Sequence, residues 1–169
     1  DHFALPNDEL VIAREKGTLQ RNFQGYSTHA ECDLIGLGIT AIGYVAGNYS
    51  QNIKVLSEYY ACLDEGKLPI QKGYTLSNDD IIRREVITDL MCHGIINFSK
   101  FDNKYGIDFK DYFADSLAKL TETIDDGLVK LTDNQLELLP QGHLMMRIVA
   151  MAFDAYLGEK QKGQFSRTV

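Results

Sequence analysis

Apolar residues in the second half of the chain recur at the spacing of amphipathic helices. Between Ile82 and Leu90 an apolar side chain stands at every fourth position, and Ser77 followed by Asp80 is a helix-capping pattern just ahead of them. The predicted order in this half is helix, short apolar piece, turn or helix, helix, hairpin and helix, over residues 77–94, 95–98, 99–105, 109–127, 128–139 and 140–157. This is the order of a winged-helix unit.

Two of these elements have their own local signals. Thr132-Asp133-Asn134 between two short apolar runs is typical of a hairpin turn. Pro140 suits the entry to the last helix, whose apolar residues run from Leu144 to Leu157.

Glycines punctuate the first fifty residues, and the apolar runs between them are short. A helix closed by Gly17, with Asn7 or Asp8 as its cap, is the clearest element. The expected elements of this half are a helix, a short buried strand, a strand end or helix start, a second helix and a connector, over residues 8–16, 34–37, 40–45, 50–63 and 66–74. The pattern therefore predicts an α+β protein, mostly helical, with a winged-helix-like C-terminal domain at 75–169.

Composition and charge exclude some classes of protein. The 169 residues are 44% hydrophobic and 24% charged, which is ordinary for a globular protein, and no apolar run approaches the roughly 18 residues needed to span a bilayer. The formal net charge is −7, and between Phe109 and Asp126, the helix that would enter a DNA groove, two lysines face five carboxylates. We expect neither nucleic-acid binding nor membrane insertion.

Cysteine usage argues against a metal site in this chain. Cys32, Cys62 and Cys92 lie thirty residues apart, which matches neither a zinc site nor an iron–sulfur cluster motif. An odd number of cysteines without a recognisable secretory signal indicates reduced thiols and a cytoplasmic protein.

Two strings could bind a ligand through their chemistry. Gly36–Ala41 has the G-x-G-x-x-A pattern of a dinucleotide-binding turn, with Glu58 twenty residues beyond Gly38, but Gly43 and Gly47 would interrupt the helix that such a site requires. We favour a tight passage beside another ligand or strand. In Arg21–Tyr26 an aromatic, an amide and a glycine follow one another, so this string is either a ligand-binding loop or a packed turn.

Several strings together resemble one enzyme family, the oxygen-independent coproporphyrinogen III oxidases. The most specific is Arg-Asn-Phe-Gln-Gly-Tyr followed by Ser-Thr, and the match extends over nearly the whole chain. The matching strings are residues 1–6 with 8–10, 21–28, 33–42 with 51–52, 153–157 and 164–167.

The resemblance implies a radical S-adenosylmethionine enzyme of haem synthesis. Such enzymes hold a [4Fe–4S] cluster on a C-x-x-x-C-x-x-C motif, which this chain lacks. We therefore expect the cluster ligands and most of the parallel barrel to lie upstream of Asp1, residues 1–65 to be the end of that partial TIM-type barrel plus a helix, and 66–74 to be a connector. The chain alone is expected to be inactive.

The resemblance also implies a binding site for a second S-adenosylmethionine. The positions that match its contacts are Phe23, Gln24 and Ile42. The implied substrate is coproporphyrinogen III, and the implied partner is the missing N-terminal barrel, with self-association of the exposed barrel end as a further expectation. The alternatives are the C-terminal domain of a related haem chaperone, and a non-catalytic winged-helix interaction module.

Overall fold

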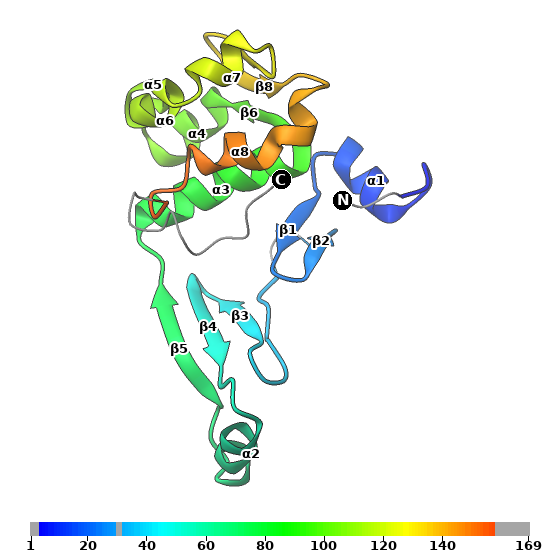
Figure 1. Cartoon of the computed structure of the whole chain (residues 1–169), viewed down its shortest axis with the longest axis vertical. Helices are drawn as coiled ribbons and strands as arrows, with labels where there is room; N and C mark the ends of the chain where they lie inside the picture. The colour runs from blue at the N-terminus through cyan, green and yellow to red at the C-terminus, as the bar shows by residue number, and fades with distance from the viewer. Residues whose placement is uncertain (1–3, 30–31, 158–169) are drawn as a thin grey trace. The chain divides into compact units, whose positions relative to one another are not determined.

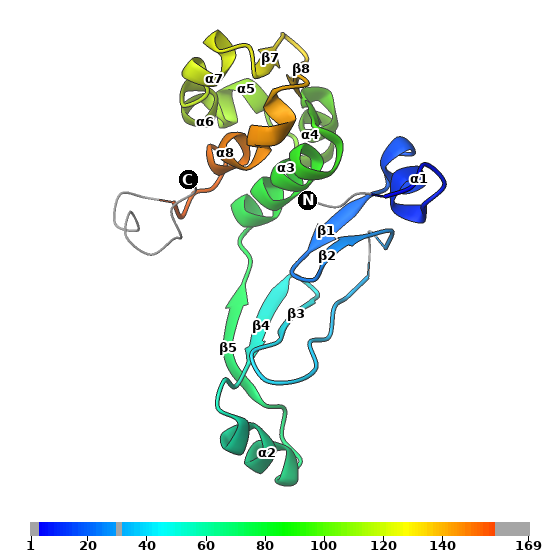
Figure 2. The ribbon, with the colours of Figure 1, turned by 45° about the vertical axis from the view of Figure 1, so that its right-hand side comes forward.

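The computed structural model describes residues 4–29 and 32–157. The chain divides into two compact units, Asp1–Ile81 and Ile82–Val169, which are considered separately (Figures 1 and 2). Both helices and strands are present, as the sequence predicts, and helix is the larger part.

The first unit combines two short helices with antiparallel strands. Its described elements are α1 (Glu9–Glu15), β1 (Gln20–Asn22), β2 (Gly25–Ser27), β3 (Ile42–Val45), β4 (Asn48–Asn52), α2 (Leu56–Asp64) and β5 (Ile70–Thr75). β1 and β2 form a hairpin, and β3, β4 and β5 form a three-stranded sheet with β4 in the middle. Every strand pair described in this unit is antiparallel, so the parallel pairing expected of a barrel end is not seen within it.

The first helix confirms its predicted signals. The Asp8 side chain accepts a hydrogen bond from the Leu10 N–H at 2.8 Å, which satisfies one of the free donors at the start of α1. The helix ends before Gly17, whose φ of 69° is a left-handed conformation that glycine adopts without strain.

The predicted buried strand at 34–37 is wrong. Only Leu34 pairs with a strand, through two backbone hydrogen bonds of 2.7 Å with Tyr44. Ile35 and Leu37 are 74% and 86% exposed, because the described residues of this unit place no second layer over them. The apolar sequence of this segment predicted burial, but it could not show whether the fold places other residues over it.

The structure also differs from the sequence prediction between residues 48 and 75. The first residues of the predicted helix 50–63 belong to β4, and α2 begins only at Leu56. The stretch 66–74, expected to be a connector, instead contains most of β5, which pairs with β4 along its length. Pairing with a neighbouring strand decides these two segments, and a single sequence does not show its partner strand.

The second unit packs helices around a small sheet. Its described elements are α3 (Asn78–His93, which begins in the first unit), β6 (Ile95–Asn97), α4 (Phe98–Tyr105), α5 (Phe109–Tyr112), α6 (Ala114–Ala118), α7 (Thr121–Asp125), β7 (Val129–Leu131), β8 (Gln135–Leu138), η1 (Gly142–Met145) and α8 (Met146–Met151). The sheet order is β6-β8-β7, all antiparallel.

The start and end of α3 follow the predicted signals. The Ser77 N–H donates to the Asp80 carboxylate at 2.9 Å, and the Asp80 N–H donates to the Ser77 hydroxyl at 3.2 Å. This reciprocal pair is the capping box that the sequence indicates. Gly94 then ends the helix with a φ of 72°.

The predicted hairpin is also confirmed. The Thr132 N–H donates to the Gln135 carbonyl at 2.9 Å, and the Thr132 hydroxyl accepts from the Asn134 and Gln135 N–H groups at 3.3 and 3.2 Å. The threonine side chain therefore closes the turn between β7 and β8.

Two predicted helices are shorter than expected. The stripe from Phe109 to Ile124 is three short helices, broken at Phe113 and Leu120, where the backbone leaves helical geometry. Both side chains are buried, so the backbone departs from helical geometry at two residues of the core. The last helix ends near Met151 rather than at Leu157.

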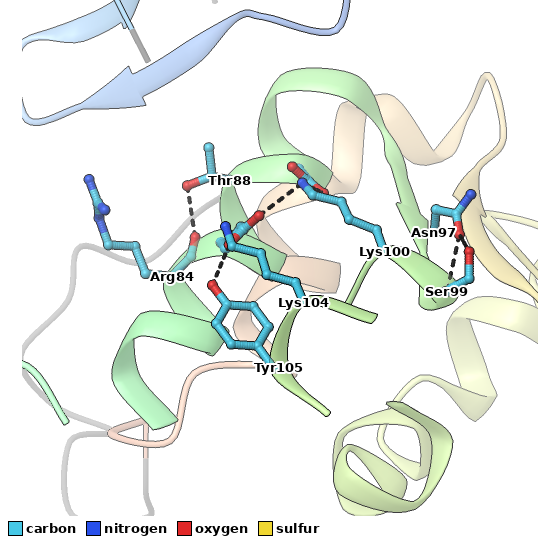
Figure 3. Close-up of polar contacts among 9 residues, drawn as sticks. Arg84, Thr88, Asn97, Ser99, Lys100, Lys104 and Tyr105 are labelled. Carbon is cyan, nitrogen blue, oxygen red and sulfur yellow. Dashed lines mark hydrogen bonds and ion pairs between the residues drawn. The ribbon is translucent and has the colours of Figure 1, made fainter. Parts of the chain in front are cut away.

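An ion-pair cluster joins α3 to α4 (Figure 3). The Glu85 carboxylate contacts Lys104 at 2.7 Å, Lys100 at 3.1 Å and the Tyr105 hydroxyl, and Lys100 also reaches Asp89 at 2.6 Å. Burial alone would raise the pKa of Glu85, but hydrogen bonds from Lys104, Tyr105 and Lys100 together hold its pKa below the usual value.

Replacing Glu85 with glutamine is expected to destabilise the chain slightly at neutral pH. A carboxyl whose pKa is lowered by folding stabilises above its unfolded pKa of about 4.3, and this contribution is lost as the pH falls through the lowered value. For a partly exposed cluster we expect about 0.2–1 kcal/mol at pH 7, shrinking below pH ~4. Urea unfolding at pH 7 and below pH ~4 measures this difference in the free energy of unfolding. The control is Glu65→Gln, whose exposed pair with Lys67 should contribute nothing measurable; an equal loss there would contradict the prediction.

Candidate functional site

The string singled out by its aromatic, amide and glycine is a tight hairpin. β1 and β2 pair as far as Asn22 and Gly25, which leaves Phe23 and Gln24 at the turn. The Gln24 N–H donates to the Asn22 side chain at 2.8 Å, and Gly25 has a φ of 125°, a conformation that a residue with a Cβ rarely adopts. Phe23 is 62% exposed, so much of its ring is open to a ligand.

The hairpin turn contacts the three-stranded sheet. The Phe23 ring meets the Tyr49 ring edge-on, with centroids 5.4 Å apart and an interplanar angle of 83°. Tyr49 in turn lies 4.9 Å from Tyr44, its direct partner on β3. Figure 2 shows the turn beside the start of β4, in agreement with the ring contact between Phe23 and Tyr49.

Ile42 lies on the same face of this sheet. Directly opposite residues of an antiparallel pair share a face, and so do residues two apart on a strand. The pairs Ile42–Gln51 and Tyr44–Tyr49 are two residues apart, so all four side chains project from one face. Phe23 packs on that face through Tyr49. The fold thus brings Phe23 and Ile42 to one side of the sheet.

The glycine-rich passage before β3 is closed by Asn52. This buried side chain donates to the carbonyl oxygens of Gly36 and Gly38, both at 2.9 Å. A Cβ on Gly36 would lie 2.9 Å from the backbone carbonyl of Ile42. The backbone at Gly36 therefore lies directly against the backbone of Ile42. The string Gly36–Ala41 leads into a strand, β3, and is a tight passage without the helix of a dinucleotide site.

Two residues of this arrangement were not predicted to have a role. Tyr49 supports Phe23, and Asn52 fixes the glycine passage. Asn52 belongs to one of the strings shared with the family. Tyr49, in contrast, stands among polar residues, and the sequence around it does not predict a role. Only the register of β3 and β4 shows its place.

The residues of this chain do not fit an iron–sulfur cluster. Cys32 is exposed, Cys62 is half-buried with its thiol near the carbonyls of Lys67 and Leu68, and Cys92 is buried on α3. Within residues 4–29 and 32–157 no three histidine, cysteine or acidic side chains are placed to hold a metal ion. In the same ranges no helix is long and apolar enough to cross a membrane.

The residues do fit an adenosyl group. An exposed aromatic ring and an aliphatic side chain on the same side of the sheet supply apolar surface, and an amide at the turn supplies hydrogen-bonding groups. Such a site consists of apolar walls with a few placed polar groups.

Comparison with known proteins identifies relatives of this chain. Residues 76–145 match the family model described as the HemN C-terminal domain. Over its full length the chain is 44% identical to the oxygen-independent coproporphyrinogen III oxidase of Pseudomonas aeruginosa and 40% identical to that of Escherichia coli, and it covers 37% of each. The corresponding enzyme of Synechocystis is 46% identical, also over 37% of its length.

A solved structure shows the same fold. The coproporphyrinogen III oxidase of Escherichia coli, described as a radical SAM enzyme, superposes with a TM-score of 0.90 and 41% identity over 93% of this chain and 36% of that one. The chain therefore spans little more than a third of the length of these relatives. The resemblance predicted from the sequence is confirmed: over its whole length the chain is similar to a part of the oxygen-independent coproporphyrinogen III oxidases, and its residues 76–145 match the model of the HemN C-terminal domain.

Proposed function

We propose that this chain is the C-terminal part of an enzyme that converts two propionates of coproporphyrinogen III to vinyl groups, giving protoporphyrinogen IX. The observation that carries the proposal is the match of the whole chain, at 40–46% identity, to enzymes named for this substrate. In each conversion a propionate loses a hydrogen atom, carbon dioxide and an electron.

The contribution of this chain is a binding site for a second S-adenosylmethionine. In such enzymes S-adenosylmethionine, when bound, is the source of the adenosyl radical that removes the hydrogen atom. Phe23 and Ile42 supply apolar surface for its adenosine, and Gln24 supplies an amide for its polar edge. The common sheet face of Phe23 and Ile42 supports this assignment.

The two units have separate proposed roles. We infer that residues 1–65 are the terminal segment of the barrel plus a helix and that 75–169 form a winged-helix-like domain that helps to enclose the porphyrinogen. The order from α3 to β8, with a hairpin beside β6, supports the second inference. The net negative charge argues against duplex DNA as a partner of this domain.

The test uses the full-length protein, purified without oxygen and supplied with coproporphyrinogen III, S-adenosylmethionine and a reductant. Formation of protoporphyrinogen IX is expected. Stoichiometric haem binding without decarboxylation would favour the haem chaperone instead. The isolated 169-residue chain, reconstituted with iron and sulfide, should take up no cluster and cleave no S-adenosylmethionine, since it lacks the ligands. Stoichiometric iron uptake with cleavage would contradict this.

We also expect the isolated chain to self-associate. The side chains of Ile35 and Leu37, on either side of Gly36, are 74% and 86% exposed. Exposed apolar patches of this kind favour contacts between chains. The double change Ile35→Ser with Leu37→Ser should shift the chain toward monomer in sedimentation experiments. Leu144→Ser, equally exposed at 85% on the second unit, is the matched control and should change little. A wild-type monomer at high concentration would contradict the expectation.

A further inference from the structure

The position of Phe23 depends on support from outside its own hairpin. β1 and β2 are three residues each, and an isolated two-stranded hairpin is marginally stable in water. The backbone of the turn is fixed by Asn22 and Gly25, but a side chain that is 62% exposed has little packing of its own to select one orientation.

Tyr49 has the opposite environment. It lies on the middle strand, paired with Tyr44 on one side and Tyr74 on the other. Its ring lies 4.9 Å from that of Tyr44 and 5.4 Å from that of Phe23. A residue on a strand that is paired on both sides has a fixed backbone, and the edge-on geometry is one that aromatic pairs prefer.

We propose that Tyr49 is a positioning residue for the second S-adenosylmethionine site. Its ring holds Phe23 edge-on above the sheet face that carries Ile42, so that the aromatic and aliphatic walls of the site are in place before the ligand binds. Preorganisation of this kind improves affinity because less ordering is left for the binding step. The inference rests on the proposed role of Phe23, and it adds that Tyr49 acts through Phe23 without being the residue that contacts the ligand.

The test measures S-adenosylmethionine binding to the full-length, cluster-containing protein by anaerobic equilibrium dialysis. Tyr49→Ile removes the ring and keeps a side chain suited to a strand. We expect affinity at the second site to fall about two- to tenfold, the range of an aromatic pair, with iron content and the first site unchanged. Tyr49→Phe, which keeps the ring, should restore wild-type binding. Tyr74→Ile removes the neighbouring tyrosine of the same sheet and is the matched control.

A double mutant separates positioning from direct contact. Since Tyr49 acts through Phe23, adding Tyr49→Ile to Phe23→Ala should cause no further loss. Additive losses would overturn the proposal, and so would unchanged binding in Tyr49→Ile while Phe23→Ala weakens it. Unfolding of both Tyr49→Ile and Tyr49→Leu, with Tyr74→Ile folded, would show a structural role instead and overturn it as well. If Phe23→Ala itself leaves the second site intact, the proposed function of Phe23 fails, and this inference with it.

Discussion

Replacing Ile42 with tryptophan in the full-length protein is expected to weaken binding of the second S-adenosylmethionine by ten- to hundredfold. Ile42 begins β3, and its backbone carbonyl would lie only 2.9 Å from a Cβ placed on Gly36. The backbone therefore has no room to retreat from a larger side chain, which must project into the space above the sheet. Overpacking costs about 1–3 kcal/mol, which corresponds to the expected loss.

The measurements are second-site binding, iron content and decarboxylation. Ile42→Val removes one methyl group without adding bulk and should bind nearly as the wild type does. Gln24→Ala should weaken the same site less, by about one hydrogen bond, or roughly 1 kcal/mol. Full activity in Ile42→Trp would show that Ile42 is not at the site. Loss of the cluster in that variant would show that the residue is structural.

The elements that could be predicted from the sequence are those whose signal is local. The Asp8 cap, the capping box of Ser77 and Asp80, and the threonine-closed turn at Thr132 each involve side chains within three residues of the backbone they bind. Chemistry at this range does not depend on the rest of the fold.

The errors concern segments whose structure depends on distant residues. β5 is a strand because β4 pairs with it, and the sequence of residues 66–74 does not itself predict a strand. The stripe from Phe109 has the spacing of one helix, yet the backbone leaves helical geometry at Phe113 and Leu120, which are both buried. Periodicity shows which residues are buried more reliably than it shows the path of the backbone between them.

The candidate site was predictable in its parts and not in its assembly. Phe23, Gln24 and Ile42 could be named only through the family resemblance, because a short aromatic loop is equally typical of a packed turn. The placement of Phe23 and Ile42 on one side of the sheet depends on the register of β3 with β4 and on the contact between Phe23 and Tyr49. Neither is encoded within a window of neighbouring residues.

The largest effect on stability is expected from Phe109→Ala. Phe109 is 1% exposed, stacks on Phe98 at 4.5 Å and contacts Phe113 at 4.7 Å and Phe101 at 5.5 Å. Truncation removes the central ring of this aromatic core and leaves a cavity that three rigid neighbours cannot fill. Such changes cost about 3–5 kcal/mol, a large part of the stability of a domain.

Urea unfolding of the 169-residue chain, followed by amide exchange, measures this loss and locates it. Protection should fall in the second unit, in α3, α4 and β8, since their apolar residues share one core cluster with Phe109. The matched control is Phe23→Ala, which removes the same ring from a position that is 62% exposed and should cost within about 0.5 kcal/mol. A loss below about 1 kcal/mol for Phe109→Ala would mean that the surrounding rings close the cavity. The contrast between the two phenylalanines would then no longer separate a residue of the core from one proposed to bind a ligand.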